Sequence, residues 1–204
     1  MQELRYAFLL RRLATILAMV TLTLCATAGL TGILLAFYYE PTAGGAYNSL
    51  KTIATEIPSG WLIKRIHDIT GNAIIAVSLI QIVVMFLGER FNRNWLTAWI
   101  SGILLTLTTI GLSWTAIILD WTQLGYWRFR IELGTIEAIP FVGSTLRNII
   151  IGGDAINTLT VQHLYTVHSY ILAGGAMVLA IIHFTGLLLQ EKQDKQIALE
   201  SIES

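Results

Sequence analysis

The sequence predicts an all-α integral membrane protein with four transmembrane helices. Of its 204 residues 54% are apolar and only 13% are charged, whereas about a quarter of the residues are charged in an ordinary soluble domain. The charged residues leave four long uncharged gaps, at 15–39, 69–87, 95–119 and 155–190. A helix needs about 20 apolar residues to cross the hydrocarbon core, so each gap fits one crossing.

The first helix is expected at about 14–39, since its apolar run ends in an aromatic cluster of the kind found at membrane interfaces. A signal peptide cleaved near residues 26–28 is the alternative, but the run is long for a signal core. The second and third helices are expected at about 66–88 and 95–119. The fourth is expected at about 164–189, because Gly152, Asp154 and Asn157 are typical of a loop and a helix start. Residues 1–204 then form a single domain.

The connection at 120–163 is long for a loop and is rich in apolar residues that Pro140 and Gly143 interrupt. This pattern predicts short helices at the membrane surface. Four crossings place both termini on one side of the membrane. That side carries seven Lys and Arg, including Arg90 and Arg93, against six on the other, so the positive-inside rule leans towards termini in the cytoplasm or stroma.

The charge balance and the single cysteine exclude several classes of protein. Thirteen basic residues balance thirteen acidic ones, so there is no positive field for nucleic acid. Cys25 alone forms no internal disulfide and no multi-cysteine metal site. The chemistry therefore depends on the histidines and on membrane partners.

His67 enters the second helix and His168 enters the fourth, so two imidazoles are expected at the same depth near one membrane face. Ligating side chains within the bilayer are functional-site candidates. Two imidazoles from facing helices are a common way to hold haem iron, whereas tetrahedral zinc needs more ligands. His163 is about 140° around the helix from His168 and is not expected to be a ligand.

A second pair is incomplete. His183 lies about 22 Å along the helix from His168 and about 60° around it. The position that should oppose it on the second helix, 14 residues after His67, is Gln81, and an amide is a weak ligand for haem iron. Three roles remain open for His183: binding a five-coordinate haem, ligating a pigment, or forming a hydrogen bond with Gln81.

The chain resembles the N-terminal four-helix half of the cytochrome b family, and within it the cytochrome b6 type of the cytochrome b6f complex. The resemblance covers nearly the whole chain. It is carried by residues 36–42, 46–49, 60–67, 121–127, 137–144, 165–168 and 183–184. It implies an all-α, haem-binding transmembrane bundle in a thylakoid or bacterial inner membrane.

For the first site, the resemblance implies that His67 and His168 ligate a b haem, whose iron is the metal. Gly32 matches a family glycine that lets the porphyrin approach the backbone, with Ala116 as its counterpart on the third helix. Lys64 replaces an arginine near the haem propionates, keeping the charge but losing the guanidinium fork.

The second site departs further from the family. Only His183 and Gly102 remain, because other residues stand at the positions of a family histidine, a glycine and two arginines: Gln81, Ala18, Val84 and Trp95. Ile16 occupies the position of the cysteine that tethers a c-type haem in the b6 type. We therefore expect one b haem, a doubtful second haem and no covalent c-type haem.

The implied function is electron transfer through one haem, as a subunit of a quinone-linked respiratory or photosynthetic complex and not as an enzyme alone. The quinol-oxidation motif is altered at 116–123, where Asp120 is either a proton acceptor or a helix-end charge. The expected partners are lipid, other electron-transfer subunits, a C-terminal-half cytochrome b subunit, quinone and a second copy in a homodimer. Two alternatives are a two-haem quinol-oxidising subunit with an unusual Gln81/His183 site and a non-catalytic assembly paralogue.

Overall fold

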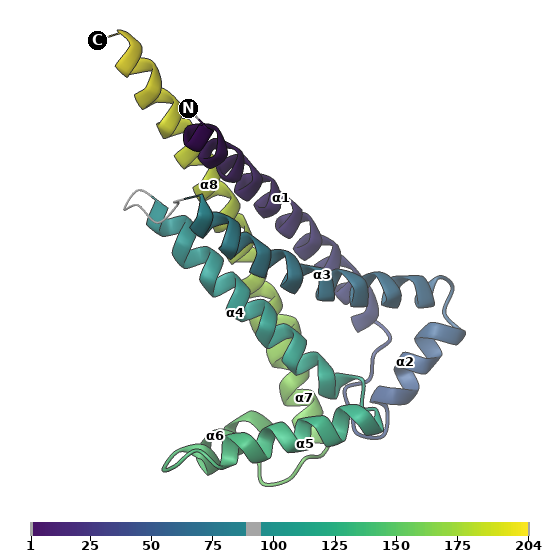
Figure 1. Ribbon diagram of the computed structural model, residues 1–204. Helices are drawn as coiled ribbons and strands as arrows, with labels where there is room; N and C mark the ends of the chain where they lie inside the picture. Colours follow the sequence, from purple (N-terminus) through teal and green to yellow (C-terminus); the bar gives the residue numbers. More distant parts are fainter. Residues whose placement is uncertain (1, 89–94, 204) are drawn as a thin grey trace. The chain divides into compact units, whose positions relative to one another are not determined.

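The computed structural model describes residues 2–88 and 95–203, and these residues form helices and connecting turns with no strand. Arg90 and Arg93, which entered the charge count, lie outside the described residues. The helices in chain order are α1 (Gln2–Ala36), α2 (Ala46–Thr55), α3 (Gly60–Leu87), α4 (Leu96–Leu119), α5 (Gln123–Glu137), α6 (Gly143–Ile151), α7 (Thr158–Thr166), a π-helical turn (Val167–Leu172) and α8 (Ala173–Glu203) (Figure 1).

Four stretches in the described part of the chain are long and apolar enough to cross a membrane. They are Leu9–Ala36, Gly60–Leu87, Leu96–Leu119 and Thr158–Gln193, so the predicted all-α fold with four transmembrane helices is confirmed. The first, second and fourth helices begin before the predicted residues, at Gln2, Gly60 and Thr158. At Gln2 and Gly60 the helix includes charged residues that precede the uncharged gap, so the charges there mark the end of the apolar run and not the end of the helix.

The chain forms two compact units, and each of the four membrane-spanning stretches contributes to both. The first unit comprises the residues up to Thr27, Thr70–Ile110 and the residues from Gly175 on. Its core combines small and large apolar side chains from these segments: Ala14, Ala18, Val84, Met85, Trp95, Ala98 and Leu187. Small residues let membrane helices approach closely, so this unit is tightly packed.

The second unit comprises Ala28–Ile69 and Gly111–Gly174. It holds the short helices α2, α5, α6 and α7, of which α5 and α6 pack against each other within the 120–163 connection. The Thr122 hydroxyl caps α5 by accepting from the Gly125 amide at 3.1 Å. The core of this unit is formed by Ile118, Phe129, Leu133, Ile151 and Leu164.

The start of the fourth membrane-spanning stretch differs from an ideal α-helix. Asn157 caps α7 through a capping box with Thr160, which explains why the helix begins earlier than predicted. A π-helical turn then spans Val167–Leu172 and contains His168. π-Turns often occur at functional sites.

Candidate functional site

His67 is oriented by two oxygen atoms of α1. Its Nδ1 lies 3.0 Å from the Ala28 carbonyl oxygen and 3.2 Å from Oγ1 of Thr31. A carbonyl oxygen can only accept, so Nδ1 of His67 carries the proton and donates it to Ala28. Nε2 then keeps its lone pair, which is the form of imidazole that binds metals.

His168 is oriented in the same way by α4. Its Nδ1 lies 2.9 Å from Oγ1 of Thr115, and that hydroxyl donates its own proton to the carbonyl oxygens of Gly111 and Leu112 at 2.9 and 3.0 Å. The oxygen of Thr115 is therefore the acceptor, and Nε2 of His168 keeps its lone pair. His67 and His168 belong to the same unit and lie within electrostatic range of each other.

Gly32 lies directly beside the His67 ring. A Cβ atom added to Gly32 would lie 3.1 Å from Cε1 and 3.6 Å from Nδ1 of that ring, and the shorter distance is tighter than ordinary van der Waals contact. The missing side chain therefore gives the imidazole the room for its present orientation. The matching position on α4, Ala116, is partly buried.

A group of charged side chains accompanies His67 in this unit. Nζ of Lys64 lies 2.9 Å from Oδ2 of Asp68 and 4.0 Å from Oδ1 of Asp120. Burial raises the pKa of Asp120 above its usual value, with Lys64 opposing the rise and Asp68 adding to it. The Tyr39 hydroxyl donates to the Leu119 carbonyl oxygen at 2.8 Å, and burial together with Asp120 raises the pKa of Tyr39.

The residue after Asp120 has a strained backbone. Trp121 has a φ of 45°, a left-handed conformation that residues other than glycine seldom adopt. Its amide donates to the Ile118 carbonyl oxygen at 3.0 Å, and its ring lies edge-on to Tyr126 with centroids 5.9 Å apart. The altered 116–123 motif therefore coincides with a constrained turn at the end of α4.

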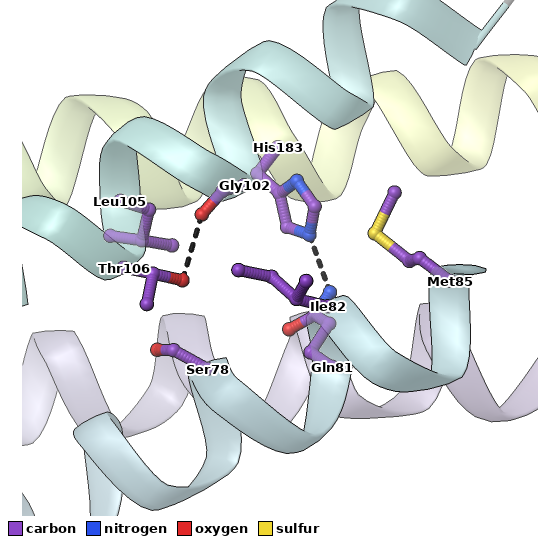
Figure 2. Close-up of a pocket in the computed structure, with 8 residues that line it drawn as sticks. All are labelled: Ser78, Gln81, Ile82, Met85, Gly102, Leu105, Thr106 and His183. Atoms are coloured by element: carbon purple, nitrogen blue, oxygen red, sulfur yellow. Dashed lines mark hydrogen bonds between the residues drawn. The ribbon is translucent and has the colours of Figure 1, made fainter. Parts of the chain in front are cut away.

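His183, in the other unit, is hydrogen-bonded through both ring nitrogens. Its Nδ1 lies 2.8 Å from the Ala98 carbonyl oxygen and 3.3 Å from Oγ of Ser101, so Nδ1 carries the proton. Its Nε2 accepts a hydrogen bond from the side-chain amide of Gln81, and Figure 2 shows the two side chains pointing toward each other from α8 and α3. The exposed fractions are only 1% for His183 and 3% for Gln81.

Gly102 takes the place beside His183 that Gly32 takes beside His67. A Cβ atom added to Gly102 would lie 2.8 Å from Cε1 of His183, so the ring would have to shift. A small cavity next to the pair offers about 10 Å³ to the centre of a water molecule, which is close to the room one water needs. It is lined by Ser78, Gln81, Ile82, Met85, Gly102, Leu105, Thr106 and His183 (Figure 2).

The donor atoms of His67 and His168 fit a haem. The described residues contain no group of three or more His, Cys, Asp or Glu that would hold a metal ion directly. Haem iron brings its own four equatorial nitrogen ligands and needs only one or two axial ones. Two imidazoles whose Nδ1 atoms carry the proton and whose Nε2 atoms are unprotonated meet that requirement.

The hydroxyl partners of the histidines were missed by the sequence analysis. Thr31, Ser101 and Thr115 each contact an Nδ1 atom, and each immediately precedes one of the small residues of the family pattern, at positions 32, 102 and 116. A hydroxyl residue followed by a small residue was the signal that would have found them. The carbonyl oxygens that accept from His67 and His183 belong to Ala28 and Ala98, and no sequence pattern marks these two residues.

The sequence and fold also match known proteins. The profile of a family described as Cytochrome b/b6/petB matches residues 1–192. Cytochrome b6 of Acaryochloris marina is 33% identical over 154 residues, which are 76% of this chain and 72% of that protein. Cytochrome b6 of Mastigocladus laminosus is 32% identical over 165 residues, which are 81% and 77% of the two chains.

A solved chain of a hyperthermophilic respiratory Complex III matches the fold with a TM-score of 0.71 and 27% sequence identity. The match covers 87% of this chain and 47% of that chain, so this chain spans about half the length of that relative.

The fold and the sites define a multi-pass helical membrane protein whose membrane-spanning stretches carry histidines oriented by neighbouring helices. The chain belongs to the cytochrome b/b6 family, as its resemblance predicts. Family membership implies a b-type haem and places the protein in the membrane.

Proposed function

We propose that this chain is an electron-carrying b-type cytochrome subunit in which His67 and His168 are the axial ligands of one haem. One observation carries the proposal. Both imidazoles lie in one unit, donate Nδ1–H to an oxygen atom of another helix, and keep the Nε2 lone pair. This second-sphere arrangement orients metal-bound histidines and increases their basicity.

The neighbouring residues would assist in three ways. Ala28 and Thr115 fix the orientation of the rings, and Gly32 supplies room beside His67. Lys64 would provide positive charge on the side of the haem propionates. A bound b haem supplies a one-electron ferric/ferrous couple.

The proposed setting is a quinone-linked membrane complex, with other electron-transfer subunits as partners. Its support comes from the relatives, which are cytochrome b6 proteins and a chain of a respiratory Complex III. A C-terminal-half cytochrome b subunit, a quinone and a second copy of this chain belong to the same proposal.

Haem content of purified variants tests the proposal. The full chain is purified in mild detergent, and haem per polypeptide is measured by pyridine haemochrome together with a reduced-minus-oxidised spectrum. We expect one b haem in the native chain and its loss in both His67→Ala and His168→Ala. The matched control is His163→Ala, a histidine of the same membrane-spanning stretch as His168, and it should keep the haem.

Haem that persists at the native level in either ligand variant would contradict the proposal. A native chain without haem that still inserts in the membrane would favour a non-catalytic paralogue instead.

A further inference from the structure

The Nδ1 atoms of His183 and His67 have the same kinds of hydrogen-bond partner. In both cases Nδ1 donates to a carbonyl oxygen of another helix and lies near a hydroxyl that precedes a glycine. At Nε2, His183 accepts a hydrogen bond from the Gln81 amide. The lone pair that a metal would need is therefore already used.

Gln81 is itself fully hydrogen-bonded. Besides the bond to His183, its amide nitrogen donates to the Ala14 carbonyl oxygen at 3.3 Å. Its Oε1 lies 3.3 Å from the Thr21 hydroxyl, which shares its proton between Oε1 and the Leu17 carbonyl oxygen at 2.9 Å. A side-chain amide has two N–H donors and one carbonyl acceptor, so both donors and the acceptor have partners. Rotating Gln81 away from His183 would leave these buried groups unpaired, which is costly.

Buried apolar side chains also fill the space around Gln81 and His183. Three residues that stand at family positions for a glycine and two arginines are buried in the apolar core of this unit: Ala18 at 1% exposure, Val84 at 8% and Trp95 at 4%. The remaining cavity beside the pair has room for no more than about one water molecule. These residues do not fit a second haem.

We propose that Gln81 and His183 form a hydrogen-bonded clasp that takes the place of a second haem in this unit. The clasp joins four helices, because Ala14 and Thr21 lie on α1, Gln81 on α3, Ala98 on α4 and His183 on α8. His183 is thus retained for helix packing and does not bind iron. The resulting count of one haem per chain rests on the proposed function, whereas the clasp itself does not.

A double-mutant cycle in the full-length chain tests the clasp without reference to haem. Gln81→Leu and His183→Phe each leave the other member of the Gln81–His183 hydrogen bond unsatisfied, while the double variant removes both members. Each single variant should lower the apparent melting temperature by about 2–4 °C or more. The double variant should lose clearly less than the sum, because contacting residues are coupled.

Strictly additive losses would overturn the clasp. The matched control cycle combines His183→Phe with Thr23→Val, whose hydroxyl is exposed and bonds only to its own helix. That control pair should be additive.

Haem counting in the same variants completes the test. His183→Phe and Gln81→Leu should keep the native haem-to-protein ratio, whereas a ratio that falls by half in His183→Phe would show that His183 holds iron and would overturn the inference. The two proposals fail separately. If His67→Ala keeps its haem, the proposed function fails, while coupling between Gln81 and His183 would still establish the clasp.

Discussion

The two units of this protein treat the same imidazole geometry differently. Around His67 and His168, hydrogen bonds engage Nδ1, so Nε2 is unprotonated in both rings, which is the form of imidazole that binds metals. Around His183, the same engagement of Nδ1 is followed by a hydrogen bond from Gln81 to Nε2. The comparison shows that a histidine can be oriented through Nδ1 in the same way whether or not its Nε2 accepts a hydrogen bond from a neighbouring side chain.

The largest expected effect is at Gly32. Gly32→Leu would force a side chain into the position of the His67 ring, since even a Cβ atom there lies 3.1 Å from Cε1. We expect loss of the haem, measured by pyridine haemochrome. Gly174→Leu is the control, because a Cβ atom at Gly174 meets nothing within 4 Å. If Gly32→Leu and Gly174→Leu contain the same amount of haem, the space beside His67 at Gly32 is not needed for haem binding.

Substituting Gly102, the glycine beside His183, should affect stability but not haem content. Gly102→Ala places a Cβ atom 2.8 Å from the His183 ring, so it should lower the melting temperature by several degrees, or about 1–3 kcal/mol for overpacking. The haem-to-protein ratio should stay the same. A parallel loss of haem would mean that the unit around His183 contributes to haem binding after all.

Removing the acceptor of His168 should have an intermediate effect. Thr115→Val deletes the oxygen that lies 2.9 Å from Nδ1, and loss of such a second-sphere partner typically weakens metal binding by about 10–100-fold. Haem titration of the apoprotein measures this. Thr109→Val is the control on the same helix, since its buried hydroxyl donates to the carbonyl oxygen of Thr106; it should bind haem like the native chain.

Thr21→Val tests the support of the clasp. It removes the hydroxyl that donates to Oε1 of Gln81 at 3.3 Å, and one hydrogen bond of this kind contributes about 0.5–1.5 kcal/mol. We expect a fall of about 2–4 °C in melting temperature, with the haem content unchanged. A melting temperature equal to that of Thr23→Val would show that Thr21 does not support Gln81.

The smallest expected effect is the pH dependence of Asp120. Burial raises the pKa of Asp120 above 3.8, so the stability it contributes is present below that pH and is lost as the pH rises through the raised value. Asp120→Asn, which does not ionise, should therefore be the more stable variant at neutral pH. Asp120 is only partly buried, with 54% of its side chain exposed, so solvent screening keeps the gain to about 2–4 °C or less.

Melting curves of the native chain and Asp120→Asn between pH 4 and 8 give the comparison, and the difference should shrink toward about pH 4. A native chain that is more stable than the variant at pH 7 would mean that pairing with Lys64 outweighs burial.

Much of this protein follows from local sequence. Long uncharged gaps between charges determine four membrane-spanning helices, because a charge within the hydrocarbon core is costly. The order and spacing of His67, His168 and His183, with several matching segments, also identify the family. These properties depend on composition along the chain and on periodicity, so they can be read without a structure.

The tertiary structure decided the contacts between helices. Which oxygen each Nδ1 meets, the π-turn that carries His168, and the hydrogen bond between Gln81 and His183 all depend on residues up to 102 positions apart. The sequence left three roles open for His183, and the structure shows the hydrogen bond. The physical reason is that a hydrogen bond forms only when the donor–acceptor distance is correct to within a few tenths of an ångström. Helical spacing, by contrast, determines only the helix face on which a side chain lies.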